Sequence, residues 1–205
     1  MSIKWLEWAR QIQSIAQAGL AFTENQYDID RYNQLRDLSV EIMSEYTGVS
    51  TEKIRDLFAN ETGYQTPKVD IRAAVFKDDT ILMVREKIDG KWSLPGGWAD
   101  VNATVKESAV KECFEEAGAK VVPGRIISIS YANRQNELKH PFSVYKIFVE
   151  CKLVEHQFSA NTETLESGFF ALDELPELSS NRNTFGQIKL CFESKNKECL
   201  EPQFD

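Results

Sequence analysis

Several features that would place a chain outside the class of soluble globular proteins are missing from this sequence. It has no window of about 18 uncharged apolar residues, which a transmembrane helix needs. Its amino-terminal stretch lacks the continuous apolar core and the small-residue cleavage site of a secretory signal. The 4 cysteines are widely spaced, form no C-x-x-C pair and predict thiols in a reducing compartment. We therefore expect a cytoplasmic protein without a membrane partner.

Positive charge is also scarce. Lysine and arginine total 24 residues against 32 of aspartate and glutamate, which gives a formal net charge of −8. Nonspecific binding to DNA or RNA needs cations that displace phosphate counterions, so this balance predicts no nucleic-acid partner. A small phosphate-bearing ligand stays compatible with it, provided that a metal ion supplies the positive charge.

Proline is absent from the first 66 residues, and this part of the chain is predicted to be helical because apolar residues recur at three- and four-residue steps. The predicted helices cover residues around 5–16, about 30–46 and about 51–58. Gly19 and Gly48 are expected to end the first two helices. Asp28 or Asp30 is expected to cap the second one. Residues 1–62 are thus predicted to form a small all-helical domain.

After a polar linker at residues 63–68, the apolar pattern changes to the short runs typical of strands. The predicted strands cover residues 69–76, 80–85, 91–94, 126–131, 144–153 and 168–171, and the predicted helices cover residues 104–117 and about 184–193. The first two strands are expected to pair as a β-hairpin. Mixed strands with a central and a terminal helix predict a second domain, residues 69–205, with a compact α/β layer fold.

The predicted helix at residues 104–117 has clear local signals at both ends. Thr104 and Glu107 fit a capping box, in which each side chain accepts a bond from the backbone N–H of the other residue. Gly118 is expected to stop the helix. Glu107 and Lys111 stand four residues apart and predict a favourable ion pair. The expected buried stripe of this helix consists of Val105, Ala109, Cys113 and Ala117.

Three carboxylates crowd the carboxyl-terminal part of this helix. Glu112, Glu115 and Glu116 stand at spacings of three and four residues, so they share one patch of its surface. Each like-charged pair destabilises a helix by roughly 0.2–0.5 kcal/mol, and the helix dipole disfavours anions in the last turn. A divalent cation would relieve both costs, because hard cations prefer oxygen ligands. The alternative is a solvated acidic face without a ligand.

A glycine-rich segment precedes the helix and completes a longer pattern. Pro95-Gly96-Gly97 is expected to form a loop whose bare backbone lets a metal ion or a phosphate approach closely. The order of glycine loop, helix, acidic cluster and glycine stop resembles the signature of the Nudix hydrolases. The matching positions are Gly97, Glu112, Glu115, Glu116 and Gly118, together with the preceding stretch Trp92–Trp98.

Two residues depart from the signature. Ala103 stands where the family usually has its first glutamate, and Lys111 stands where it usually has arginine. In the family these two side chains help to hold the segment together, so one brace is expected to be lost here. The capping box and the Glu107–Lys111 pair are expected to substitute for it. The departures therefore bear on catalytic efficiency more than on the fold.

The resemblance covers nearly the whole chain and is to the Nudix subgroup with a helical N-terminal domain. It implies an α+β or α/β fold, the Nudix-type α/β/α sandwich with a mixed sheet, in an enzyme that forms a homodimer. It also implies that water attacks phosphorus and breaks the diphosphate bond of a nucleotide substrate, a nucleoside diphosphate linked to another moiety, such as ADP-ribose or CDP-choline. The alternative is a Nudix-like binding or regulatory module that has lost catalysis, which only the altered first half of the signature supports.

The resemblance also implies a metal site. The cofactor would be Mg²⁺ or Mn²⁺, since metal ions that bridge diphosphate oxygens polarise phosphorus and lower the pKa of a bound water. Glu112 and Glu116 would be the main ligands. Glu115 would assist them, and the carbonyl group of Gly97 would complete the shell.

A general base is expected to take the proton of the attacking water. In the family this base lies either in the signature or in a later loop, which makes Glu115, Glu163 and Glu166 the candidates here. Of the two loop glutamates, Glu166 aligns better with the acidic position of the family. The alternative for each loop glutamate is a solvated charge without a catalytic role.

Four further residues are candidate substrate contacts. Arg72 and Arg85 belong to predicted strands that border the site, and arginine suits bidentate contacts with phosphate, although a surface ion pair is the alternative for each. Trp98 would either stack on a base or pack in the core. His140 would either line the pocket or be an ordinary loop residue. The apolar stripe of the first helix is predicted to be core or dimer interface rather than a ligand contact.

Overall fold

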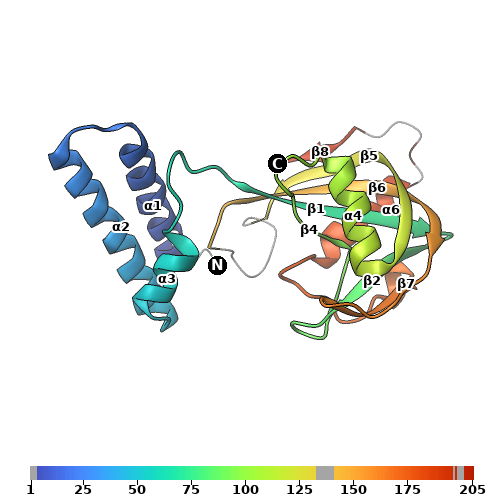
Figure 1. The fold of residues 1–205 in the computed structure, drawn as a ribbon. Coiled ribbons are helices and arrows are strands. Elements are labelled where there is room, and N and C mark those ends of the chain that lie inside the picture. The colour runs from blue at the N-terminus through green and yellow to red at the C-terminus, as the bar shows by residue number, and fades with distance from the viewer. Residues whose placement is uncertain (1–3, 133–140, 196, 198–200) are drawn as a thin grey trace. The chain divides into compact units, whose positions relative to one another are not determined.

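The computed structural model describes residues 4–132, 141–195, 197 and 201–205 of the chain, and the candidate His140 lies outside these residues. The chain divides into two compact units. The first comprises Met1–Pro67 with Pro141–Ser143, and the second comprises Lys68–His140 with Val144–Asp205. Figure 1 shows helices in the first unit, and a sheet flanked by helices in the second.

Helices α1 (Lys4–Phe22), α2 (Gln26–Thr47) and α3 (Thr51–Phe58) make up most of the described part of the first unit (Figure 1). Their apolar faces meet in one core, as the three- and four-residue periodicity predicts. The buried core residues are Leu6, Ala9, Val40, Met43, Ile54, Phe58 and Ala59. The helical interpretation of this part of the chain is therefore confirmed.

The predicted cap of α2 is wrong. The helix is capped by Asn25, whose side-chain oxygen accepts bonds from the backbone N–H groups of Tyr27 and Asp28 at 2.9 and 3.3 Å. Asp28 and Asp30 both lie inside the helix. The apolar periodicity begins only after a polar first turn, which is why the pattern placed the start too late. The predicted end at Gly48 is confirmed, with the left-handed conformation (φ 68°) that glycine adopts readily.

Gly19 does not end α1, contrary to the prediction. The helix continues to Phe22, and the carbonyl group of Gly19 accepts a helical bond from the N–H group of Thr23 at 2.9 Å. Gly19 instead allows close packing of α1 on α2. A Cβ atom at this position would lie 2.2 Å from Cζ of Tyr32, so a larger residue would push the two helices apart.

The second unit is built on one mixed sheet. Its strands are β1 (Lys68–Lys77), β2 (Thr80–Glu86), β3 (Trp92–Ser93), β4 (Gly96–Trp98), β5 (Ala119–Tyr131), β6 (Val144–His156), β7 (Thr164–Phe170) and β8 (Gln203–Phe204). Their order is β3-β2-β1-β6-β5-β8, with β4 also paired to β1 and β7 to β2. The β1–β6 and β5–β8 pairs are parallel and the other pairs are antiparallel.

Helices cover both faces of this sheet. On one face α4 (Val105–Ala117) buries Ala109, Cys113 and Ala117 against β1, β2, β5 and β6. On the other face α6 (Phe185–Lys195), which follows the short 3₁₀ helix η1 (Leu172–Glu174), buries Ile188 and Cys191. The predicted α/β/α sandwich with a mixed sheet is confirmed, and so is the buried stripe of α4.

Three strand predictions need correction. Residues 96–98, expected to be a bare loop, form strand β4 and pair with Asp70–Arg72 of β1. Strand β5 begins at Ala119, directly after the helix, and not at residue 126. Strand β7 begins at Thr164 rather than residue 168. In each case polar residues or glycine hide the apolar pattern of a strand in the sequence, and pairing with a neighbouring strand keeps the segment extended.

None of the helices in the described residues is long and apolar enough to cross a membrane. Cys113, Cys151 and Cys191 are buried free thiols. Burial raises the pKa of the Cys151 and Cys191 thiols to about 12, so both are held in the unreactive neutral form.

Candidate active site

The candidate site is built around helix α4, whose two ends form as predicted. The Thr104 hydroxyl accepts a bond from the N–H group of Glu107 at 3.2 Å, and the Glu107 carboxylate accepts one from the N–H group of Thr104 at 2.8 Å. These bonds from Thr104 hold the pKa of Glu107 below its ordinary value. At the other end Gly118 has φ 63°, and a Cβ atom there would lie 2.2 Å from the carbonyl oxygen of Gln157. The capping box and the glycine stop therefore fix both ends of the helix.

Lys111 does not pair with Glu107, contrary to the prediction. Its ammonium group lies 2.6 Å from Oδ2 of Asp100 and 3.7 Å from Oε2 of Glu115. The bond to Asp100 raises the pKa of Lys111. Asp100 stands three positions before Ala103, in the loop that leads into the helix. The brace expected to be lost at Ala103 is therefore supplied by a different acid, which the signature gave no reason to consider.

Glu116 is buried beneath strand β4, with 5 % of its surface exposed. Its Oε2 atom accepts a bond from the N–H group of Gly96 at 2.8 Å. Gly96 has φ 146°, and a Cβ atom there would lie 2.0 Å from the carbonyl oxygen of Ile71, so only glycine fits. Burial raises the pKa of Glu116 to about 8, against the opposing effects of Arg72 and of the bond from Gly96. A carboxylate with this pKa is poised to gain from a cation.

Glu112 lies one helical turn before Glu116 and faces the same strand. A Cβ atom built on Gly97 would lie 3.3 Å from Oε2 of Glu112, so the missing side chain of Gly97 leaves room for this carboxylate. Burial is also the main cause that raises the pKa of Glu112. The two carboxylates therefore converge on the backbone of Gly96 and Gly97 and share a partly desolvated space.

This donor set suits a hard divalent cation. No three side chains of His, Cys, Asp or Glu within the described residues come together as a complete metal site. The arrangement offers instead two carboxylates, from Glu112 and Glu116, beside the backbone of Gly97. Mg²⁺ commonly binds through one or two carboxylates and takes its other ligands from water and substrate phosphates, so the residues fit it. Glu115 is 56 % exposed and faces Lys111, and its assisting role stays a prediction.

Arg72 does not contact solvent, so the expectation that it binds substrate directly is wrong. Its side chain is fully buried in the sheet. Nε and Nη2 donate to the two carboxylate oxygens of Asp70 at 2.7 and 3.0 Å, and Nη1 donates to the carbonyl oxygen of Leu94 at 3.1 Å. Arg72 therefore holds β1 against the segment before β4, and its positive charge opposes the rise in the pKa of Glu116.

The two loop glutamates occupy different surroundings. Glu166 lies opposite Arg85 in the β2–β7 pair, and its Oε1 atom lies 3.1 Å from Nη1 of Arg85. The charge of Glu163, by contrast, acts on Glu112 and contributes to its raised pKa after burial. Glu163 is also exposed, so its carboxylate is accessible to water. The carboxylate of Glu166 is thus engaged by Arg85, and the choice of base between the two glutamates stays a prediction.

The sequence analysis did not identify two residues near Glu163 as part of the site. The amide nitrogen of Asn161 donates to the carbonyl oxygen of Glu115 at 2.8 Å, and the hydroxyl of Thr164 donates to that of Glu116 at 2.6 Å. Asn at the first position of a short polar segment is a signal for a turn. The sequence offered no signal that this turn would dock on α4.

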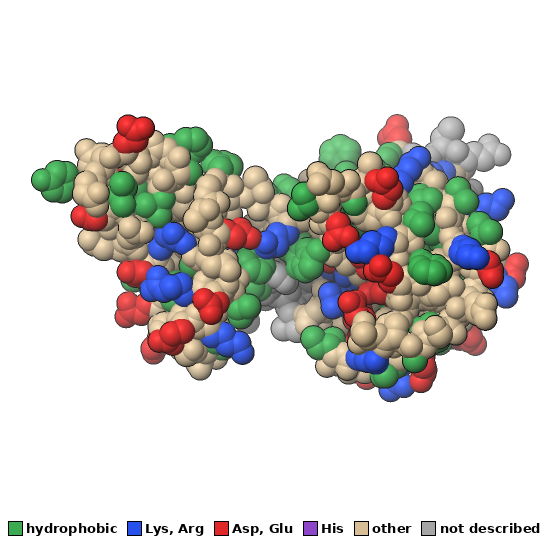
Figure 2. Space-filling view, in the orientation of Figure 1, with side chains coloured by type: hydrophobic (Ala, Val, Ile, Leu, Met, Phe, Trp, Pro, Cys, Tyr) green, Lys and Arg blue, Asp and Glu red, His purple; other side chains and the backbone are tan. Residues whose placement is uncertain are grey.

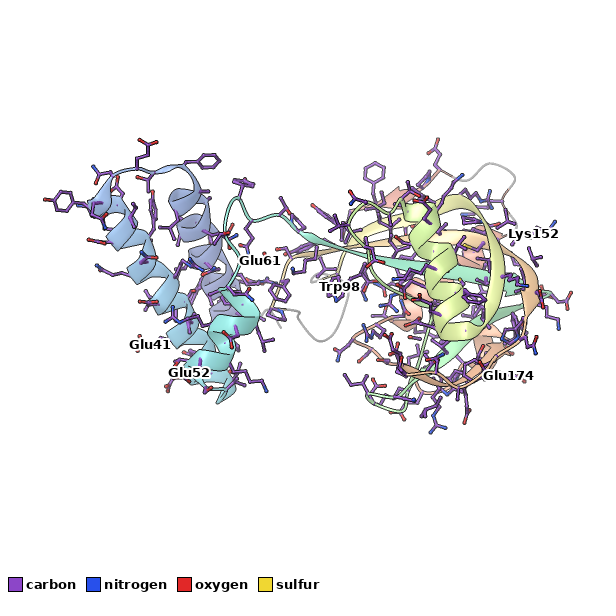
Figure 3. The ribbon with its side chains drawn as sticks, in the orientation of Figure 1. Glu41, Glu52, Glu61, Trp98, Lys152 and Glu174 are labelled. Carbon is purple, nitrogen blue, oxygen red and sulfur yellow. The ribbon has the colours of Figure 1, made fainter. Side chains whose placement is uncertain are left out.

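The remaining candidates lie around the site. Arg85 pairs with Glu166 and donates through Nε to the carbonyl oxygen of Gly90 at 2.8 Å. Trp98, labelled in Figure 3, ends β4 and is 44 % exposed, which rules out the core alternative. Over the face of the second unit that carries α4, Figure 2 shows acidic side chains next to basic ones. The expectation for His140 lies outside the described residues.

Comparison with known proteins agrees with this geometry. Residues 66–188 match the family model of the NUDIX domain. The chain belongs to the Nudix family. Residues 3–58 match a second Nudix model, described as a UDP-X-like, N-terminal oligomerisation domain. The enzyme class expected from the signature, a Nudix pyrophosphohydrolase, is thereby confirmed, and Nudix hydrolases generally use divalent metal cations.

Several relatives resemble the chain over most of its length. A Bacillus subtilis protein named "Putative ADP-ribose pyrophosphatase YjhB" is 43 % identical over 190 residues, which cover 93 % of this chain and 91 % of that protein. The crystal structure of a UDP-X diphosphatase is 31 % identical and covers 98 % of both chains, with a TM-score of 0.64. The crystal structure of an ADP-ribose pyrophosphatase from Streptococcus suis is 46 % identical and covers 68 % of this chain and 100 % of its own, also with a TM-score of 0.64.

Proposed function

We propose that this Nudix enzyme hydrolyses the diphosphate bond of a nucleoside diphosphate linked to another moiety. The observation that carries the proposal is the convergence of Glu112 and Glu116 on the backbone of Gly96 and Gly97. The names of the relatives, ADP-ribose pyrophosphatase and UDP-X diphosphatase, support the substrate class. These names indicate ADP-ribose and UDP-linked compounds as substrates to compare, and the resemblance of the sequence adds CDP-choline.

The proposed cofactor is Mg²⁺ or Mn²⁺, held by Glu112, Glu116 and the backbone carbonyl of Gly97. When bound, the cation would neutralise the diphosphate and lower the pKa of an attacking water. Glu116 is held in place for this by the bond from Gly96, and the charge of Arg72 favours its ionised form. The oxygen of water would bond to one phosphorus as the bridging P–O bond breaks. The products would be two phosphomonoesters, and a base would take the released proton.

Glu163 is the proposed general base. Its exposed carboxylate belongs to the turn that Asn161 and Thr164 attach to the end of α4, whereas the carboxylate of Glu166 is engaged by Arg85. Arg85 and Trp98 are proposed to contact the substrate, because both side chains are at least 40 % exposed, Trp98 directly follows Gly97 in β4, and Arg85 pairs with Glu166. Glu115 remains a further candidate for the base.

We further propose that the enzyme is a homodimer assembled through its first unit. The side chains of Trp8, Ile15 and Phe22 are 57, 53 and 77 % exposed, and they stand seven residues apart along α1. Residues spaced by seven lie along one line of a helix, as in helices that pair with one another. An apolar line of this kind, in a domain whose family model is described by oligomerisation, supports a self-association surface.

A panel of nucleotide substrates tests the proposed activity. The enzyme, freed of metal and then supplied with Mg²⁺ or Mn²⁺, is expected to convert at least one nucleoside diphosphate derivative to two monophosphates. Glu116→Gln is the matched inactive control, and excess EDTA is expected to stop turnover. Full turnover in EDTA would refute the metal site. Binding of the nucleotides without hydrolysis would favour the regulatory module. The only support for that alternative is the altered first half of the signature, where the ion pair between Asp100 and Lys111 replaces the lost brace.

A further inference from the structure

The carbonyl end of helix α4 presents acceptors that the helix itself cannot satisfy. The last carbonyl groups of any α-helix lack intrahelical partners, and burying them unpaired is costly. The N–H group of Gly118 bonds the carbonyl groups of Cys113 and Phe114. Of the last four carbonyl groups, those of Glu115, Glu116 and Ala117 remain, and the first two belong to residues of the acidic cluster. Whatever binds these two groups is thereby fixed relative to the candidate metal ligands.

Asn161 and Thr164 bind them. The amide nitrogen of Asn161 lies 2.8 Å from the carbonyl oxygen of Glu115 and 3.3 Å from that of Glu116. The hydroxyl of Thr164 donates to the carbonyl oxygen of Glu116 at 2.6 Å, and the Thr164 side chain is fully buried. The segment that carries Glu163 is therefore attached to the last turn of α4 through both residues.

The same two residues shape the turn that presents Glu163. The side-chain oxygen of Asn161 accepts bonds from the N–H groups of Glu163 and Thr164, both at 2.9 Å. The carbonyl group of Glu163 accepts a bond from the N–H group of Lys87 at 2.9 Å, and the Lys87 ammonium group bonds the carbonyl group of Asn161. With both ends of its amide engaged, Asn161 joins the backbone of Glu163 to the backbone of Glu115.

We propose that Asn161 and Thr164 are positioning residues that set the place of the Glu163 carboxylate relative to Glu112 and Glu116. The inference rests on the proposed function and deepens it. Glu163 is exposed, and the backbone turn that carries it determines where its carboxylate can reach. A displacement of about 1 Å in a catalytic group can cost about 10²-fold in rate, which gives such a turn a measurable role.

Steady-state kinetics of the full-length enzyme test this inference. Asn161→Ala is expected to lower kcat by about 10²-fold while KM and the metal requirement change little. Thr164→Val, which keeps the shape but removes the hydroxyl, is expected to lower kcat in the same way. Thr164→Ser keeps the hydroxyl and is expected to restore most of the activity. The thermal unfolding midpoint of each variant is measured alongside.

A double-mutant cycle separates positioning from helix capping. If Asn161 acts through Glu163, Asn161→Ala is expected to cost no more than about twofold in kcat once Glu163→Gln is present. An equal loss of kcat in both backgrounds would show a purely structural role and overturn the inference, as would a fully active Glu163→Gln enzyme. A wild-type enzyme that hydrolyses no nucleoside diphosphate derivative would instead remove the proposed function, and this inference with it.

Discussion

At the residue scale, burial of Glu116 disfavours the charged form of its carboxylate in the folded protein. Burial raises its pKa from the ordinary 4.5 to about 8. A carboxyl group whose pKa is raised by folding stabilises the protein fully below its unfolded pKa, and this contribution is lost as the pH rises through the folded pKa. Without metal, stability is therefore expected to fall between about pH 4.5 and about pH 8, and a divalent cation is expected to restore it.

Glu116→Gln removes the charge and keeps the shape. In EDTA at about pH 8, the substitution is expected to raise the free energy of unfolding by on the order of 1–3 kcal/mol, while hydrolysis is lost. Denaturant unfolding of wild type and variant across the pH range measures the effect. Glu115→Gln, at the exposed neighbour, is the control and is expected to leave the pH profile of stability unchanged. A variant less stable than wild type at about pH 8 would contradict the assigned pKa.

The two loop glutamates give a second prediction at this scale. Glu163→Gln is expected to lower kcat by roughly 10²–10⁴-fold while metal affinity stays nearly unchanged, because a general base acts on water rather than on the cation. Glu166→Gln removes a surface pair with Arg85 and is expected to change kcat far less. Metal titrations and initial rates with one substrate compare the two. The opposite ranking would return the base to Glu166.

At the scale of single elements, helix α4 was the most predictable part of the site. Its capping box, its buried stripe and its glycine stop depend on residues within the helix or next to it, so spacing alone located them. The partners that lie further away in the chain were not predictable. Asp100 was missed as the partner of Lys111, Asn161 as the partner of the helix end, and strand β4 as a strand. Each of these three contacts forms between segments that only the tertiary fold places next to each other.

The start of α4 supplies the prediction for this scale. Thr104→Ala removes one half of the capping box and is expected to cost about 0.5–2 kcal/mol of stability, measured by denaturant unfolding. Thr104→Ser keeps the hydroxyl and serves as the matched control. Ala103→Glu is expected to be tolerated, since Asp100 already engages Lys111. An unchanged unfolding midpoint in Thr104→Ala would mean that the loop and its Lys111–Asp100 brace hold the helix start alone.

At the scale of the whole molecule, the candidate active site lies within one of the two units. The acidic cluster, Gly96–Gly97 and the Asn161 turn all belong to the second unit. The first unit has its own core, yet α1 leaves large apolar side chains in solvent. Periodicity predicted the helices but could not separate core from interface along α1, because both are apolar. The exposed fractions of the side chains in the structure make that distinction, and they place Trp8, Ile15 and Phe22 on the surface.

Self-association through this surface is the prediction for the whole molecule. Ile15→Glu and Phe22→Glu place a charge on the apolar line and are expected to weaken dimerisation at least about tenfold, because large side chains at the centre of an interface dominate its affinity. Sedimentation over a range of protein concentrations measures the effect. Ile88→Glu, an equally polar change at a residue that is 82 % exposed in the second unit, is the control and is expected to leave the dimer intact. A wild-type chain that stays monomeric at micromolar concentration, or an Ile88→Glu variant that dissociates as readily as Ile15→Glu, would contradict assembly through α1.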